Sequence, residues 1–287
     1  MIKSNIKNQI SKILSFICAL LLFCSFALTK ENYPQRIISL GPGITEELYL
    51  LGVENKLIAN TVYCERPPEA QKKEKIGTVI KVDLEKIVSL EPDLVIATSL
   101  SNPEQVEKLK NLGIKVVTFP ATKSFFQLCE QFLELAKLVG EEEKAARIIH
   151  QAKKEVDAIR KKVKDLPMPK VFVQVGAKPL FTVTKNSFVH DFIKFAGGIN
   201  ITEKAKSGLY SREKVLKSNP DIIIIVTMGI AGKEEKKIWQ KYKTMKAVKN
   251  NRIHIIDSYK LCSPTPVTFV EALKEMGEIL HPRLETD

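Results

Sequence analysis

The chain has 287 residues, of which 44% are hydrophobic and 27% charged, and its formal net charge is +12. The length allows one large domain or two of ordinary size, and the composition is ordinary for a soluble globular protein. The positive charge raises the question of a nucleic-acid partner, but basic residues stand beside glutamates, as in residues 142–144 and 153–155. We therefore interpret them as solvated helix faces and expect no nucleic-acid partner.

The N-terminal segment has the three parts of a secretory signal peptide. Three lysines precede an apolar run over residues 13–23, and small residues then offer a cleavage site after Ala27. The run is shorter than the ~20 residues of a membrane-spanning helix, so we predict a cleaved signal peptide over residues 1–27 and a periplasmic protein. Cys24 offers a site for a lipid anchor, but the bulky Phe23 before it disfavours lipoprotein processing.

Cleavage after Ala27 removes three lysines and no acidic residue, which lowers the net charge from +12 to +9. Nothing in the remainder is apolar for long enough to span a membrane, so we expect a soluble mature protein. Export permits disulfides. The mature chain keeps an odd number of cysteines, Cys64, Cys129 and Cys262, which excludes a disulfide-stapled scaffold.

An internal repeat with an offset of 128 residues is the most informative pattern. Residues 84–96 and 212–224 each indicate a short helix that stops at a Pro-Asp turn and leads into an apolar, β-branched run. Glu85 and Glu213 occupy the same position in the two copies. Proline ends a helix because it has no N–H group, and the apolar run has the length of a strand buried on both faces of a parallel sheet.

The flanking segments extend this repeat. A strand, at residues 36–40 in one half and 170–176 in the other, leads through a loop into a helix that ends at glycine. Each half closes with a further strand, at residues 114–119 and 252–256. Because such an alternation builds parallel sheets covered by helices, we predict an α/β protein of two Rossmann-like lobes, with Phe181 in a loop.

A long helix is predicted between the lobes. Over residues 141–166, apolar side chains recur at spacings of three and four, and Pro167 and Pro169 end the pattern. At ~1.5 Å per residue this helix spans roughly 39 Å. A flexible linker would be rich in Gly and Ser, so the pattern predicts a stiff strut between the lobes.

These segments together resemble class III periplasmic binding proteins, the iron-siderophore, haem and vitamin B12 receptors of ABC importers. The likeness runs through residues 36–48, 63–70, 84–96, 171–176, 179–182 and 197–200, of which the last three are especially similar to the vitamin B12-binding branch. The resemblance implies a domain over residues 36–287. It comprises an N-terminal lobe (36–123), a helical segment with the interlobe backbone helix (124–166) and a C-terminal lobe (170–283).

A protein of this kind is not an enzyme and has no intrinsic cofactor. The resemblance implies that it binds a metal-chelate, such as a corrinoid, between its lobes and delivers it to the permease dimer of an ABC importer with its ATPase. A monomer is expected. The alternatives are a haem receptor, with Tyr63 as an axial ligand, and a ferric-siderophore receptor, with Arg66 and Arg212 near the predicted loops. A remote alternative is an exported chelatase-like enzyme, which would need a base or metal site in the cleft.

The implied cleft lies beyond the carboxyl ends of the strands. Tyr63 and Phe181 match aromatic cleft positions of the vitamin B12-binding members, and Asp257 matches an acidic one. Tryptophans of some members are replaced here by Val79 or Thr98 and by Ser207. The predicted ligand-binding residues are Pro42, Gly43, Tyr63, Cys64, Val79, Thr98, Phe181, Ser207, Tyr210, Asp257 and Ser263.

The cysteines admit two interpretations. By the same resemblance, Cys64 and Cys262 fall on cleft loops of opposite lobes, where a thiolate, as a soft ligand, could meet a metal carried by the bound molecule. The alternative is a small buried hydrophobic side chain. Cys129 is expected in the core, and Trp239 on a helical surface away from the cleft. The histidines show no spacing typical of a metal site.

In the family, a glutamate on the outer face of each lobe pairs with arginines of the permease. Glu213 matches the second-lobe residue, and Glu104 is the first-lobe candidate, with Glu85 as the repeat counterpart of Glu213. The alternative is that these are ordinary charges on helix surfaces, where single ion pairs contribute little.

Overall fold

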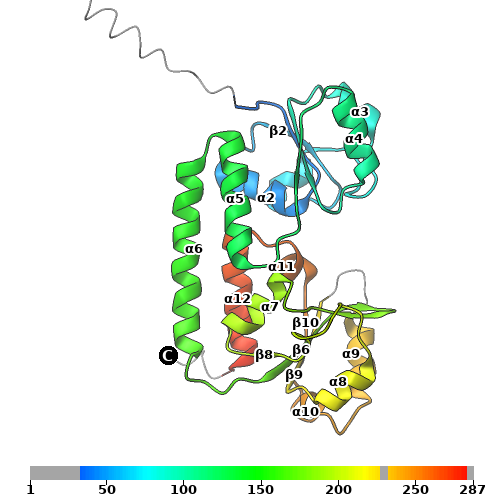
Figure 1. The fold of residues 1–287 in the computed structure, drawn as a ribbon, viewed down its shortest axis with the longest axis vertical. Helices are drawn as coiled ribbons and strands as arrows, with labels where there is room; N and C mark the ends of the chain where they lie inside the picture. Colours follow the sequence, from blue (N-terminus) through cyan, green and yellow to red (C-terminus); the bar gives the residue numbers. More distant parts are fainter. Residues whose placement is uncertain (1–32, 227–231, 283–287) are drawn as a thin grey trace, which may run out of the picture. The chain divides into compact units, whose positions relative to one another are not determined.

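The computed structural model describes residues 33–226 and 232–282, and the predicted signal peptide lies outside these ranges. The segment Pro34–Asp287 forms one compact unit, which carries two five-stranded sheets (Figure 1). Within the described ranges, no helix combines the length and the apolar character that a membrane span requires.

The first sheet is parallel throughout, with the strand order β3-β2-β1-β4-β5. Its elements are β1 (Ile37–Ser39), α2 (Pro42–Leu51), β2 (Leu57–Asn60), the short 3-10 helix η1 (Pro68–Lys72), β3 (Glu74–Lys75), α3 (Leu84–Ser89), β4 (Leu94–Thr98), α4 (Pro103–Asn111) and β5 (Val116–Phe119). Helix α2 packs on one face, whereas α3 and α4 pack on the other. The central strands are therefore buried on both sides, which explains their unbroken apolar runs.

The second sheet has the order β10-β9-β6-β7, and β8 pairs with the start of β6. Its strands are β6 (Lys170–Ala177), β7 (Leu180–Thr182), β8 (Ile199–Asn200), β9 (Ile222–Val226) and β10 (Ile253–Ile256). Strand β7 runs antiparallel to β6, so the prediction of a loop at Phe181 is wrong. Leu180 and Thr182 are buried while Phe181 between them is exposed, which is the alternation of a strand with one face in solvent.

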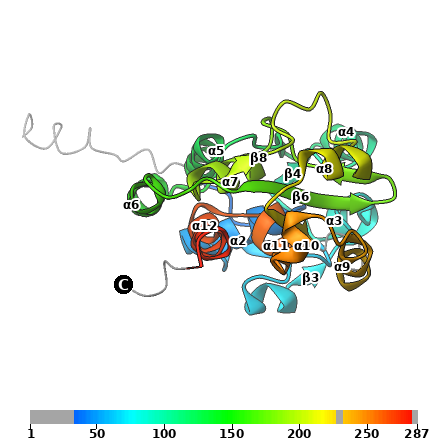
Figure 2. The same ribbon diagram turned by 90° about the horizontal axis from the view of Figure 1, so that it is seen from below.

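Helices cover both faces of the second sheet. Helices α7 (Phe188–Phe195) and α12 (Pro266–Leu280) pack on one face, and α8 (Arg212–Ser218), α9 (Gly232–Gln240) and α10 (Lys246–Lys249) pack on the other. Figure 2 shows α7 and α12 on the side of α6 (Glu142–Val163), with α8 and α9 farther from it. The short helix α11 (Ser258–Cys262) follows β10 and leads into α12.

The strut predicted over residues 141–166 is helix α6, but it is not alone. Helix α5 (Phe125–Val139) and α12 pack alongside it (Figure 1). The buried faces of the three helices belong to one hydrophobic cluster that also includes Leu94 of the first sheet and Val171 of the second. The two lobes therefore share a continuous core, which a single connecting helix could not provide.

The Pro-Asp repeat has the same structural role in both lobes. The Asp93 carboxylate accepts hydrogen bonds from the backbone N–H groups of Gln35, at 2.7 Å, and Arg36, at 3.1 Å. The Asp221 carboxylate accepts one from the N–H of Lys170 at 2.8 Å. In each case the aspartate binds the backbone where the first strand of its lobe begins, so the repeat aligns two adjacent parallel strands.

Candidate ligand-binding cleft

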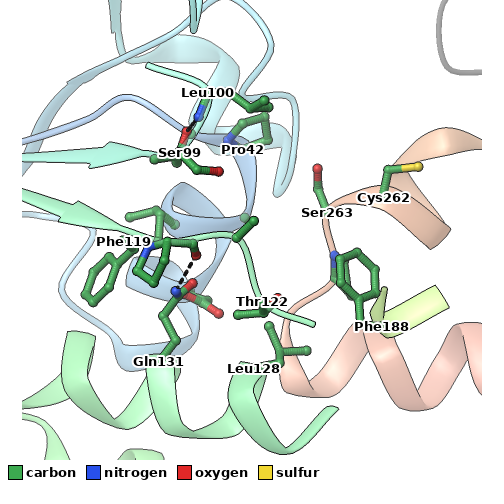
Figure 3. Close-up of a pocket in the computed structure, with 18 of the residues that line it drawn as sticks. Pro42, Ser99, Leu100, Phe119, Thr122, Leu128, Gln131, Phe188, Cys262 and Ser263 are labelled. Atoms are coloured by element: carbon green, nitrogen blue, oxygen red, sulfur yellow. Dashed lines mark hydrogen bonds between the residues drawn. The ribbon is translucent and has the colours of Figure 1, made fainter. Parts of the chain in front are cut away.

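A cavity of about 250 Å³ lies between the lobes, beyond the carboxyl ends of β1, β4 and β5. Figure 3 shows Phe188 and Ser263 of the second lobe across from Thr122 and Leu128. Most of the lining is apolar. The predicted residues that line it are Pro42, Gly43, Val79, Thr98 and Ser263. The position agrees with the rule that open α/β sheets bind ligands beyond the carboxyl ends of their strands.

Two of the three predicted aromatic residues, Tyr63 and Phe181, are exposed and lie outside the wall of this cavity. Tyr63 is 53% exposed and Phe181 is 42% exposed. Phe181 is held on β7, which pairs with β6 on one side and bridges to Leu209 on the other. Because exposed aromatic side chains on rigid backbone lose little entropy on binding, both are suited to contact a large planar ligand.

Cys64 does not face the cleft surface, contrary to the expectation of a ligand contact. Its side chain is fully buried, and its Sγ lies 3.2 Å from the hydroxyl oxygens of Thr45 and Thr61. Thr45 belongs to α2, and Tyr63 directly precedes Cys64. The buried thiol therefore anchors the Tyr63 loop to α2, as expected for a small, weakly polar side chain.

Cys262 is half-buried and lines the cavity. Burial raises the pKa of its thiol to about 11, so the thiol is protonated at neutral pH. Figure 3 shows its sulfur directed away from Ser263 and the first lobe. This arrangement favours packing over metal ligation. Among the residues that the structure describes, no three His, Cys, Asp or Glu side chains are grouped as metal ligands.

The remaining predicted residues lie at the periphery. Tyr210 is partly buried, and its ring centre lies 6.3 Å from that of Phe172, at the edge of the core of the second lobe. Ser207 is exposed, and so is Asp257, whose carboxylate accepts the Tyr259 N–H at 2.8 Å and caps α11. None of these three lines the cavity.

The prediction that Trp239 lies on a helical surface is wrong, because its side chain is fully buried. Its Nε1–H donates to the Gln174 side-chain oxygen at 2.6 Å, and Gln174 donates to the Glu235 carboxylate at 2.8 Å. Arg212 donates to the same carboxylate at 2.5 Å and lies 4.6 Å from the centre of the Trp239 ring. This buried network joins β6, α8 and α9. Local sequence patterns do not predict it, because its members come from three separate segments.

Arg66 connects the two lobes. Its guanidinium donates to the backbone oxygens of Tyr259, at 3.0 Å, and Ser263, at 3.4 Å. It lies 4.6 Å from the centre of the Tyr259 ring and 3.1 Å from the Glu46 carboxylate of its own lobe. The Tyr259 hydroxyl in turn accepts the backbone N–H of Glu65 at 3.2 Å. These contacts hold α11 against the loop that carries Tyr63.

We expect Arg66→Ala to lower the free energy of unfolding by about 2 kcal/mol, because it removes hydrogen bonds from a charged donor. Urea denaturation measures this change, and amide hydrogen exchange should become faster around α11. The matched control is Arg147→Ala, whose ion pair with Glu143, at 3.8 Å, is exposed and contributes little. Equal effects of the two substitutions would contradict the interlobe role of Arg66.

Comparison with known proteins gives the family. Residues 37–260 match the family model described as periplasmic binding protein. The chain is 29% identical, over 88% of its length and 82% of the relative's, to the uncharacterized ABC transporter substrate-binding lipoprotein YvrC of Bacillus subtilis strain 168.

Two solved structures share the fold. The periplasmic vitamin B12-binding protein BtuF of Vibrio cholerae matches with a TM-score of 0.73 and 26% identity, over 88% of this chain and 99% of that one. A possible iron-binding periplasmic solute-binding protein of Staphylococcus epidermidis matches with a TM-score of 0.78 and 28% identity, over 87% and 100%. The fold is thus that of class III periplasmic binding proteins, and the chain belongs to the periplasmic binding protein family, as a substrate-binding protein of an ABC transporter and not an enzyme.

Proposed function

We propose that this protein captures a corrinoid, such as cobalamin, in the cleft between its lobes and delivers it to the membrane permease of an ABC importer. The observations that carry the proposal are two exposed aromatic side chains, Tyr63 and Phe181, one on each lobe, and a mainly apolar cavity between the lobes. Stacking on aromatic rings suits a wide, flat macrocycle. The similarity to the vitamin B12-binding protein of Vibrio cholerae supports the same ligand.

Haem is the second candidate, because the exposed phenol of Tyr63 is available as an axial iron ligand. A ferric siderophore is less favoured. Anionic chelates need cationic partners, yet Arg66 is engaged between the lobes and Arg212 is paired with Glu235. The similarity to the possible iron-binding protein of Staphylococcus epidermidis keeps an iron chelate among the ligands to be tested.

The test is a comparison of cyanocobalamin, haem and a ferric siderophore by isothermal titration calorimetry, with visible spectra of each mixture. We expect tight, stoichiometric binding of cyanocobalamin without turnover. Tighter binding of haem, with a spectral shift that Tyr63→Phe abolishes, would replace the corrinoid by haem. Binding of none of the three would contradict the proposal.

Phe181→Ala should weaken corrinoid binding about 10-fold, because the ring contributes stacking and buried apolar area on one side of the ligand. Tyr63→Ala should have a similar effect, whereas Tyr63→Phe should retain most of the affinity. Calorimetry measures both. The control is Phe126→Ala, which removes another exposed ring, 60% exposed, on helix α5. If Phe181→Ala binds like this control, Phe181 is not a ligand contact.

For docking on the permease we propose Glu213 and Glu85. Each is the second residue of its helix, α8 and α3, and each is exposed. The helices begin alike: the side chain of Ser211 caps α8, and that of Asp83 caps α3, by accepting the N–H of the third helical residue. Glu104 lies in α4, which stands between β4 and β5 as α9 stands between β9 and β10, so the repeat pairs Glu213 with Glu85 and not with Glu104.

We also propose export to the periplasm, by the signal peptide over residues 1–27. The relative from Bacillus subtilis is named a lipoprotein. In this chain the corresponding modification would fall on Cys24. Mass spectrometry of the mature protein distinguishes the two routes, since cleavage after Ala27 leaves no Cys24 to carry a lipid.

A further inference from the structure

The cavity between the lobes contains a carboxyl group whose role the fold does not explain. Glu47, on α2, is 2% exposed and lines the cavity. Its Oε2 is buried and has no hydrogen-bond partner. A buried polar atom without a partner costs about 1–3 kcal/mol, so a side chain in this state is expected where a ligand completes the hydrogen bonding.

Within the part of the chain that the structure describes, the surroundings of Glu47 contain no positive charge that would hold a carboxylate. The lining of the cavity includes no lysine, arginine or histidine. The ionisable groups near it are Glu46 on α2, Cys129 on α5 and Cys262 on α11, and the charge of Lys153 on α6 acts on Cys129. Burial raises the pKa of the Cys129 thiol to about 12 and that of Cys262 to about 11, so both thiols are neutral.

Burial, and then the charge of Glu46, raise the pKa of Glu47 well above its usual value. The carboxyl group therefore keeps its proton in the closed, apolar setting and can donate a hydrogen bond. The first turn of α2 adds backbone N–H groups at Gly43 and Ile44, which contribute partial dipoles and no full charge. The cavity thus offers donors to an oxygen acceptor and no counter-ion to an anion.

We propose that Glu47 is a ligand-selecting residue at the floor of the cleft, and that it binds a neutral oxygen acceptor, such as the carbonyl of an amide-bearing arm, in preference to a carboxylate. This inference rests on the proposed function and deepens it. Corrinoids carry amide arms around the macrocycle, whereas haem carries propionates. The cavity of about 250 Å³ is too small for a macrocycle and has room for one such arm.

The experiment uses the mature protein with Glu47→Gln and Glu47→Leu, and titrates cyanocobalamin by calorimetry at pH 6. Glutamine keeps a donor of the same shape, so its affinity should stay within about 3-fold of the wild type. Leucine fills the space without a donor, so its affinity should fall about 10-fold, as expected for the loss of one buried hydrogen bond. The control Glu143→Gln, at an exposed position on α6, should bind like the wild type.

A second arm compares cyanocobalamin with its monocarboxylic acid derivatives, in which one amide arm is a carboxylate. At least one derivative should bind more weakly to the wild type than the parent does, and this difference should disappear in Glu47→Leu. Binding of cyanocobalamin by Glu47→Leu as tightly as by the wild type would overturn the inference. So would an equal loss in both variants. Failure of the wild type to bind any corrinoid would instead contradict the proposed function.

The unliganded protein provides an independent readout. A carboxyl group whose pKa is raised by folding contributes stability at low pH that is lost as the pH rises through its folded pKa. Glu47→Gln should therefore unfold at a higher temperature than the wild type at pH 8, and the difference should close near pH 4. A constant difference between pH 4 and pH 8 would show that folding does not raise the pKa of Glu47.

Discussion

Replacing Glu85 and Glu213 together by lysine should abolish ligand uptake in cells while leaving ligand affinity unchanged. The two glutamates are exposed on α3 and α8, and neither lines the cavity. Surface ion pairs are weak one by one, but charges in matched positions on two lobes orient a partner, and reversing them replaces attraction by repulsion. Glu213 forms an exposed ion pair with Lys217, one turn farther along α8, at 2.8 Å. A permease arginine can replace this lysine at little cost.

The measurement is uptake of labelled cobalamin in cells that depend on this protein, with calorimetry on the purified variants. Glu104→Lys and Glu143→Lys are the controls, because they change the charge equally at exposed positions outside the repeated helices. Each single reversal at Glu85 or Glu213 should have a partial effect. Normal uptake by the double variant, or a stronger effect of Glu104→Lys, would show that docking uses another surface.

Glu235→Ala should lower the free energy of unfolding by about 3 kcal/mol, because it leaves Arg212 unpaired and removes the acceptor of Gln174. Glu235 is 5% exposed, so water does not readily replace the lost partner. Urea denaturation monitored by Trp239 fluorescence reports on this network directly, since the indole lies in it. A loss below about 1 kcal/mol would indicate that the network reorganises without Glu235.

The pH dependence of this network has a definite sign. Burial alone would raise the pKa of Glu235, but the hydrogen bonds from Gln174 and Arg212 and the Arg212 charge outweigh it and lower the pKa. The stability that ionised Glu235 contributes is therefore present above its ordinary pKa of 4.5 and is lost as the pH falls through the folded value. The matched variant Glu235→Gln should lack this acid-sensitive component.

Local patterns predicted the elements that depend on neighbours along the chain. The Pro-Asp repeat predicted α3, β4, α8 and β9, because helix termination and β-branched runs depend only on residues that are adjacent in the sequence. The strut was predicted within three residues at either end, because its apolar spacing extends over six turns. These signals need no tertiary information.

Contacts between distant segments were not predictable in this way. Trp239 lies in a helix of mostly charged residues, and only the face of β6 and β9 above it explains its burial. The bonds from Arg66 to Tyr259 span 193 residues. The buried position of Cys64 depends on Thr45 of α2, and the unpartnered carboxyl of Glu47 becomes apparent only where both lobes enclose it.

The shared core has a consequence for the order in which the protein folds. Phe269 of α12 stacks on Phe192, with ring centres 4.2 Å apart, and lies 4.5 Å from Phe125 of α5. The chain therefore supplies the ring that covers Phe125 and Phe192 only when α12 has been made. Until then, the apolar surfaces of α5 and α7 remain open, and neither half is a finished folding unit during synthesis. A chain that ends before α12 would expose these aromatic surfaces and become a substrate for chaperones and proteases. Only a chain that includes α12 can therefore complete the shared core.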